Sequence, residues 1–125
     1  MERRNTVQKD MVLDAVKRLM NHPTAEEIYE LIHNEHPSVS KGTVYRNLGV
    51  LVDEDKLVKV GVADGPDHYD HTLEKHFHMC CRKCKRVVDI NTRQFDINNL
   101  LSDNNHFIED YDVVFKGVCK NCIEV

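Results

Sequence analysis

Apolar residues in the first third of the chain recur at the spacing of helix faces. In the segment 6–20 they fall at i, i+4, i+7 and i+8, which predicts a helix that ends before Pro23. The apolar positions on its predicted buried face are Val12, Val16, Leu19 and Met20. Thr24 and Glu27 then have the T-x-x-E spacing of a capping box, which predicts that a second helix begins there and ends before Pro37.

A third helix and a hairpin complete the first half of the chain. The helix is predicted to begin at Ser38 or Ser40 and to bury one apolar stripe. The residues of that stripe are Val44, Leu48, Leu51 and Val52. The segment 57–62 then alternates loosely between apolar and polar residues, and a turn cluster at 64–67 separates it from residues 68–70. Three helices followed by a short hairpin indicate a winged helix-turn-helix domain, whose third helix enters the major groove of DNA.

The second half of the chain has a different pattern of apolar and polar residues. Its predicted elements are short strands around Phe77 and at 87–90, a helix at 92–105 and a strand at 107–119. Together they predict a small α/β domain, with the linker near residues 64–72. The expected fold class is therefore α+β, with a winged helix-turn-helix domain at 1–70 and the small domain at 71–125.

Composition indicates where the protein is located, and the net charge gives no support for nucleic acid binding. The chain of 125 residues has 41% hydrophobic and 30% charged residues, and no apolar run reaches the length of a membrane span. The first residues contain no apolar signal-peptide core, so we expect a cytoplasmic protein without a membrane partner. The formal net charge of −4 does not suggest nucleic acid binding, so any DNA-binding function must rest on motifs.

Two C-x-x-C pairs predict a closed metal site. They are Cys81 with Cys84 and Cys119 with Cys122. Two residues between cysteines allow a tight turn to aim both sulfurs at one point, and two such turns complete the tetrahedron that suits structural zinc. The alternative is a pair of redox dithiols or free thiols. Cys80 does not fit the pattern and is expected to be a small apolar core residue.

A second set of residues suggests another metal ion. His76 and His78 are two residues apart, so in a strand both imidazoles point to the same face. Carboxylates at Asp70 and Asp89 would direct such a site toward iron or manganese, and His36 at the end of the second helix could reach it from the first domain. Taken singly, His36 is also compatible with a helix-end cation, and either aspartate with a solvated acid.

The other histidines are expected at the surface. They are His22, His33, His68, His71 and His106. Of these, His68 and His71 are possible substitute ligands, because both lie close to Asp70 in the sequence.

From end to end the chain resembles the ferric uptake regulator family of bacterial metal-dependent repressors. The matching stretches are TVQKDMVLDAV, HPTAEEIYELI, SKGTVYRNLGVL, HYD, HFHMCCRKC, VVD and GVCKNC. The resemblance implies a winged helix at the N-terminus, a C-terminal α/β dimerisation domain, and homodimers on palindromic DNA operators. It also implies that the four paired cysteines hold a structural zinc.

Within that family the chain is most similar to the peroxide-responsive branch. The resemblance implies a regulatory iron or manganese ion on His36, Asp70, His76, His78 and Asp89, with His36 and His76 as the oxidation-sensitive residues. Iron- and zinc-sensing branches usually have glutamate at the position of Asp89 or of Asp70. The chain departs from the family at His68, where relatives commonly have arginine.

The ion would lock the two domains so that both recognition helices of a dimer fit one operator. The residues of the third helix that lie off its buried stripe are the candidate DNA contacts, namely Lys41, Thr43, Tyr45, Arg46 and Asn47. Without the resemblance they could equally form an ordinary solvated helix face.

Other classes of function remain open on the sequence alone. A plain iron or zinc uptake regulator would lack the peroxide response, and a thiol-redox sensor would use the cysteine pairs directly. An iron enzyme with two histidines and one carboxylate is a third alternative. Because no substrate pocket or cofactor motif is visible, we expect neither an enzyme nor a small-molecule substrate.

Overall fold

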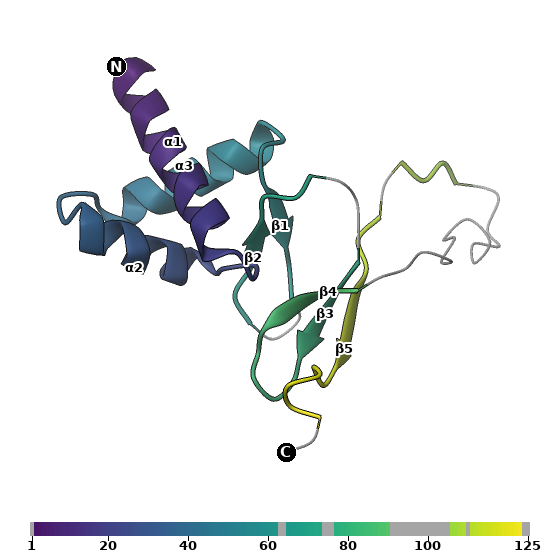
Figure 1. Cartoon of the computed structure of the whole chain (residues 1–125). Helices are drawn as coiled ribbons and strands as arrows, with labels where there is room; N and C mark the ends of the chain where they lie inside the picture. The colour runs from purple at the N-terminus through teal and green to yellow at the C-terminus, as the bar shows by residue number, and fades with distance from the viewer. Residues whose placement is uncertain (1, 63–64, 74–76, 91–105, 110, 124–125) are drawn as a thin grey trace.

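In a computed structural model, the described part of the chain consists of three helices and two small sheets (Figure 1). The structure describes residues 2–62, 65–73, 77–90, 106–109 and 111–123. Its elements are α1 (Glu2–Leu19), α2 (Ala25–Glu35), α3 (Lys41–Asp53), β1 (Val58–Val60), β2 (His68–Asp70), β3 (Phe77–Cys81), β4 (Val87–Ile90) and β5 (Val114–Gly117). The predicted helix at 92–105 lies outside the described residues. None of the helices in the described ranges is long and apolar enough to cross a membrane.

The three helices enclose one apolar core. Its fully buried residues are Val12, Ala15, Val16, Ile28, Ile32, Val44, Leu48, Leu51 and Leu57. The predicted stripes are therefore buried, except that Met20 is exposed and Leu19 and Val52 are half-buried. The capping box of α2 is confirmed, because Thr24 Oγ1 accepts from the Glu27 N–H at 3.2 Å and Glu27 Oε1 accepts from the Thr24 N–H at 2.9 Å. Ser40, not Ser38, caps α3.

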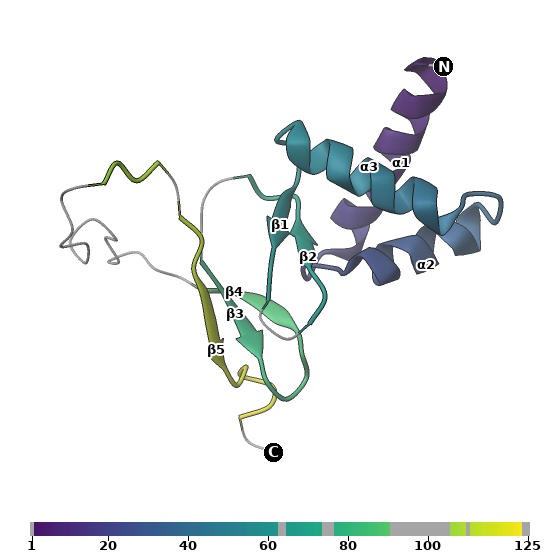
Figure 2. The same ribbon diagram turned by 180° about the vertical axis from the view of Figure 1, so that it is seen from behind.

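The wing consists of β1 and β2, which pair antiparallel with Val58 opposite Asp70 and Val60 opposite His68. It lies between the helices and the second sheet in both views (Figures 1 and 2). The Tyr69 N–H donates to the Pro23 carbonyl at 2.9 Å, and Thr24 forms an isolated bridge with His68. The wing is thus attached to the beginning of α2.

The second sheet has the strand order β4-β3-β5, with β3 antiparallel to β4 and parallel to β5. The strand predicted at 107–119 is shorter, since β5 covers only four residues. Alternation along the strands places His78, Cys80, Asp89, Val114 and Lys116 on one face, because His78 pairs with both Asp89 and Val114 while Cys80 pairs with Lys116. We call this the histidine face of the sheet.

The connection between α1 and α2 has an unusual backbone. Met20, Asn21 and His22 have φ angles of 54°, 38° and 56°, which are all in the left-handed region. A residue with a Cβ adopts this conformation at a cost of about 1 kcal/mol or more, so three in succession require compensating contacts. The sequence pattern did not predict this turn, although Pro23 correctly marked the end of the helix.

Candidate metal centres

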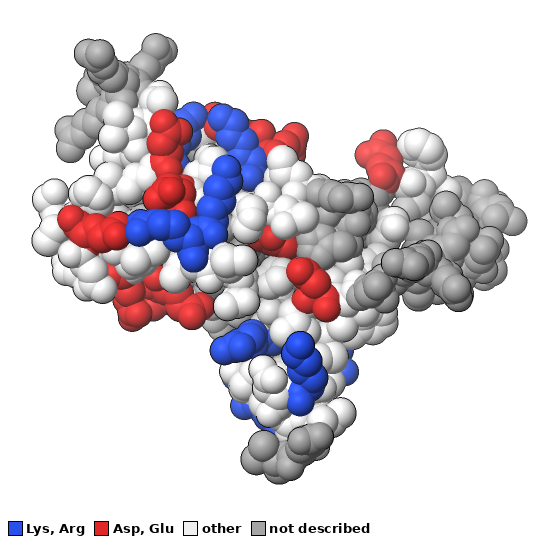
Figure 3. Space-filling model, in the orientation of Figure 1, with Lys and Arg blue, Asp and Glu red and all other residues white. Residues whose placement is uncertain are grey.

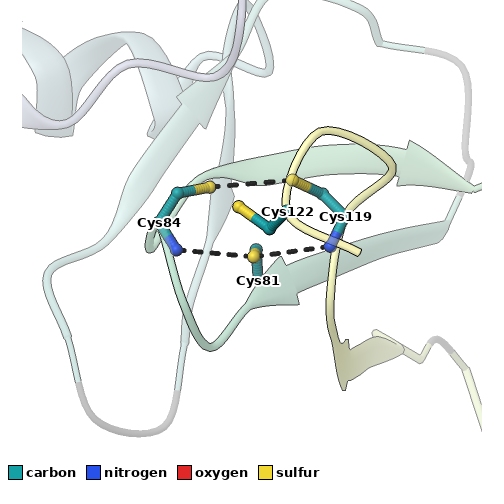
Figure 4. A group of neighbouring side chains, drawn as sticks. All are labelled: Cys81, Cys84, Cys119 and Cys122. Atoms are coloured by element: carbon teal, nitrogen blue, oxygen red, sulfur yellow. Dashed lines mark hydrogen bonds between the residues drawn. The ribbon is translucent and has the colours of Figure 1, made fainter. Parts of the chain in front are cut away.

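Four cysteine side chains converge at the end of the second sheet nearest the C-terminus (Figure 4). The cluster consists of Cys81, Cys84, Cys119 and Cys122, whose sulfurs all lie within 4.8 Å of one another. The parallel pairing of β3 with β5 explains the convergence, because both strands finish at the same end of the sheet, where Cys81 is the last residue of β3 and the second C-x-x-C pair follows β5. Among the four, Cys84 Sγ and Cys119 Sγ are 3.8 Å apart. A tetrahedral zinc with bonds of about 2.3 Å would separate its sulfurs by about 3.8 Å, so the cluster fits zinc.

Electrostatics in the cysteine cluster favour a cation. The N–H groups of Cys84 and Cys119 each donate to Cys81 Sγ at 3.4 Å, and these donors lower the pKa of Cys81 to about 5. The pKa of Cys122 is raised to about 12, because its thiol is hydrogen-bonded to Cys119 and burial disfavours its thiolate. The thiol of Cys81 is therefore readily ionised, and a bound divalent cation would stabilise the thiolate forms of the other three cysteines. Cys80 lies outside the cluster, as predicted, but it is only half-buried on the histidine face and is not a core residue as expected.

A second cluster joins the wing, the second sheet and the turn before α2. It consists of His22, Asp70, His78 and Asp89. His22 Nε2 lies 3.1 Å from Asp70 Oδ2 and 2.9 Å from Asp89 Oδ1. His78 Nε2 lies 3.3 Å from the same Asp70 oxygen and 3.6 Å from the same Asp89 oxygen. Two imidazoles thus share two carboxylate oxygens, and their rings are stacked edge to face at 5.0 Å.

Each member of this cluster comes from a different element. Asp70 ends β2, while His78 and Asp89 are cross-strand partners on β3 and β4. His22 belongs to the left-handed turn before α2, and its carbonyl accepts from His68 Nδ1 at 2.7 Å. Of the four, only the placement of His22 depends on a backbone turn that the sequence pattern did not predict.

Hydrogen bonds and opposite charges in this cluster shift the pKa values of His22 and Asp70 against the effect of burial. Burial opposes protonation of His22, but the carboxylates of Asp70 and Asp89 outweigh it and raise the pKa of the imidazole. Burial likewise opposes ionisation of Asp70, but His22, His78 and the Thr72 N–H hold the pKa of its carboxyl far below the usual range. Asp70 is therefore an anion although it is only 5% exposed.

The donor atoms suit a hard or borderline divalent ion. Octahedral coordination with bonds of about 2.1 Å places adjacent ligand atoms about 3.0 Å apart, close to the shorter distances in this cluster. Two imidazole nitrogens and two carboxylates are the donor types of iron and manganese sites. The two clusters are thus consistent with a structural zinc and a regulatory iron or manganese ion.

The prediction that His36 reaches the second cluster is wrong. His36 is the exposed C-cap of α2, whereas the cluster lies at the opposite end of that helix, about 16 Å away for eleven residues. His22, which we expected at the surface, takes part instead, with a side chain only 9% exposed. Its place just before the capping box is the signal that could have identified it. His76 lies outside the described residues, so its ligation stays a prediction.

Other histidines divide between the surface and the interior. His68 is buried, contrary to expectation, and acts on His22 through the carbonyl bond rather than as a member of the cluster. His71 is half-buried, whereas His33 and His106 are exposed as predicted.

The candidate DNA contacts on α3 are only partly exposed. Lys41, Tyr45 and Arg46 are exposed, whereas Thr43 is half-buried and its N–H donates to the side chain of the cap residue Ser40. Asn47 was wrongly assigned to the exposed face: it is 5% exposed and donates to the Thr43 carbonyl at 2.8 Å within its own helix. Space-filling shows basic and acidic side chains side by side over the helices (Figure 3).

Known proteins resemble this chain along most of its length. The sequence model of the ferric uptake regulator family matches residues 1–115. The peroxide-responsive repressor PerR of Staphylococcus epidermidis is 31% identical over 97% of this chain and 82% of its own length. That of Staphylococcus aureus is 30% identical over 95% and 82%.

Solved structures agree with these sequence relatives. The peroxide stress regulator of Campylobacter jejuni superposes with a TM-score of 0.78 at 30% identity, covering 97% of this chain and 93% of its own. The ferric uptake regulator of Helicobacter pylori has the same fold, with a TM-score of 0.76 at 23% identity over 92% of this chain and 79% of its own.

The cysteine cluster predicts different outcomes for neighbouring cysteines. Cys81→Ser removes the sulfur that accepts two N–H groups, so we expect loss of bound zinc and of the folded second sheet. Structural zinc contributes on the order of 10 kcal/mol to folding in small domains. Cys80→Ser is the matched control and should keep one zinc per chain. Metal analysis and size-exclusion chromatography of both variants test the assignment, and zinc loss in Cys80→Ser alone would overturn it.

Proposed function

We propose a function for this chain, which belongs to the ferric uptake regulator family of metal-dependent regulators: it is a dimeric repressor that binds palindromic DNA and senses peroxide through its regulatory metal ion. The main support for the proposal is that the side chains of His22, Asp70, His78 and Asp89 converge in one cluster. Similarity to relatives described as peroxide-responsive repressors supports the peroxide part.

The second cluster would act as a clasp between the DNA-binding half and the second sheet. His22 is attached to α2, and Asp70 ends the wing, whereas His78 and Asp89 belong to the sheet. An ion held by all four stabilises the arrangement in which they converge. Regulators of this family are DNA-binding dimers, so fixing this arrangement in both protomers would fix the distance between their two α3 helices. The boundary of the two domains near residue 70 remains a prediction.

DNA recognition is proposed for the exposed residues of α3. Arg46 offers a fork of donors suited to guanine, Tyr45 offers an aromatic surface for a thymine methyl, and Lys41 offers a cation for phosphate. Glu26 of α2 contacts two of these residues. Its Oε2 lies 2.8 Å from Lys41 Nζ and accepts from the Tyr45 hydroxyl at 3.3 Å. Glu26 therefore competes with phosphate for Lys41.

Peroxide sensing is proposed at the imidazoles of the second cluster. A ferrous ion bound there would supply the electrons that convert hydrogen peroxide into a short-lived oxidant. The nearest oxidisable rings are those of the ligands, and we propose His22, in place of His36, together with His76 as the residues that gain oxygen. An oxidised imidazole is a poorer ligand, so the clasp opens and DNA is released. The cysteines, held by zinc, would be slower targets.

An iron or zinc uptake regulator without peroxide sensing is the second candidate. It would use the same clasp, and solved structures of ferric uptake regulators share this fold. The aspartates at positions 70 and 89 favour the peroxide-responsive reading, because the resemblance places glutamate at one or the other in iron and zinc sensors.

The clasp predicts opposite results for two histidines of the first domain. His22→Ala should lower operator affinity in Mn²⁺ by an order of magnitude or more, because the clasp loses the ligand from the helical half. His36→Ala should bind DNA like the unmodified protein. Zinc content and dimer should be normal in both variants. Operator binding by fluorescence anisotropy tests the pair, and weak binding by His36→Ala alone would restore the original assignment.

Peroxide should oxidise the ligand histidines only in the iron form. Tryptic peptides 19–41 and 76–82 carry the expected sites, but they also carry His33, His36 and His78. Met20 and Met79 in the same peptides also take up oxygen. Fragment spectra must therefore place the added oxygen on His22 or His76, with the manganese form as control. DNA release with unmodified histidines and oxidised cysteines would replace the proposal by a thiol-based sensor.

Glu26 predicts a gain of DNA affinity. Glu26→Gln should raise operator affinity by roughly threefold to tenfold and steepen the salt dependence by about one phosphate contact, because Lys41 is released. Glu35→Gln is the matched control at the far end of α2, where the carboxylate pairs with Arg18. Affinity measured across a salt series tests this, and an equal gain in both variants would show a general charge effect.

A further inference from the structure

A cavity of about 380 Å³ lies between the wing and the histidine face of the second sheet. From the wing side it is lined by Val62, Gly65, Pro66 and His68, and from the sheet side by Cys80, Val114 and Lys116. It adjoins the cysteine cluster at Cys81, and no member of the second cluster lines it. Its volume falls within the range of about 300–1,000 Å³ that is typical of pockets for small ligands.

The chemistry of the lining points to one class of ligand. Val62, Pro66 and Val114 supply apolar surface. Arg82, Lys85 and Lys116 supply cations, and none of the described lining residues is acidic. The same end of the sheet shows basic side chains in the space-filling view (Figure 3). From these observations we infer that the cavity binds a small amphipathic anion, with an apolar chain or ring inside and a carboxylate or similar group near the cations.

His68 gives the cavity a buried polar group. It is 6% exposed, and its Nδ1 is bonded to the His22 carbonyl. Its Nε2 has no hydrogen-bond partner among the described residues, and the ring borders the cavity. A ligand in the cavity would therefore touch the side chain that holds the turn carrying His22.

Occupation of the cavity should favour metal binding. The ligand would contact the wing and the sheet together, and these two elements carry Asp70 and the pair His78 and Asp89. It would thus stabilise the arrangement in which the second cluster converges. By linkage, the ligand then raises metal affinity by the same factor by which metal raises ligand affinity. This coupling rests on the proposed clasp, whereas ligand binding itself does not.

Cys80 provides a direct readout of the cavity. It is the one cysteine of the five outside the zinc-binding set, and it lines the cavity. In the zinc-loaded full-length protein without regulatory metal, decanoate below its micelle concentration should slow modification of Cys80 by N-ethylmaleimide. Decanol has the same chain without the charge and should protect much less. Absence of protection by decanoate, or equal protection by decanol, would overturn the anion site.

A matched pair of variants locates the anion. Lys116→Glu should weaken the protection by decanoate by roughly threefold to tenfold, because a cation near the carboxylate is replaced by an anion. Lys120→Glu makes the same charge change on an exposed residue that does not line the cavity, and should behave like the unmodified protein. Equal loss in both variants would show that decanoate responds only to net charge.

The coupling is measured by Mn²⁺ titration with and without decanoate, reading free Mn²⁺ by electron paramagnetic resonance. Higher Mn²⁺ affinity with decanoate, and stronger protection of Cys80 with Mn²⁺, support the coupling. Protection of Cys80 with unchanged Mn²⁺ affinity would overturn the coupling alone. Absence of Mn²⁺ binding at the second cluster would instead contradict the proposed function and leave the cavity site in place.

Discussion

The loop before α2 is bonded to the wing, and the second metal cluster depends on that attachment. His68 Nδ1 donates to the His22 carbonyl at 2.7 Å, and the Tyr69 N–H donates to the Pro23 carbonyl at 2.9 Å. Thr24, the N-cap of α2, forms a bridge with His68. These bonds fix the start of α2 against the strand that ends at Asp70. The His22 side chain is thereby brought within hydrogen-bond distance of a carboxylate from a segment far away in the sequence.

The left-handed turn of Met20, Asn21 and His22 is the energetic cost of that geometry. Three non-glycine residues in this region cost about 1 kcal/mol or more each, and such conformations persist where surrounding contacts impose them. Here the contacts are the bond from His68 and the two carboxylates that His22 meets. The buried imidazole of His68 therefore supports the turn.

Periodic features of the fold could be predicted, and features that depend on one backbone turn could not. C-x-x-C spacing sufficed for the cysteine cluster, whereas alternation put His78 on one face of a strand without showing that Asp89 would be its cross-strand partner. The error at His36 arose because both ends of α2 carry a histidine before a proline. Choosing between them requires knowing which end of the helix contacts the wing. Asn47 was wrongly expected on the exposed face because it is polar, but its side-chain amide donates to a carbonyl of its own helix and can therefore be buried.

The two clusters differ in what they connect, and this difference assigns their roles. The cysteines all lie at or just beyond the ends of β3 and β5, which are already adjacent strands, so an ion there stabilises one folded unit. The second cluster joins the turn before α2 and the end of the wing to the sheet. If the helices and wing move away from the sheet, His78 and Asp89 remain together but His22 and Asp70 are lost as ligands. An ion held as proposed would therefore bind the two arrangements with very different affinity. That difference is what a ligand needs to shift a population, since moving a balance from 1:99 to 99:1 takes about 5.5 kcal/mol of differential binding.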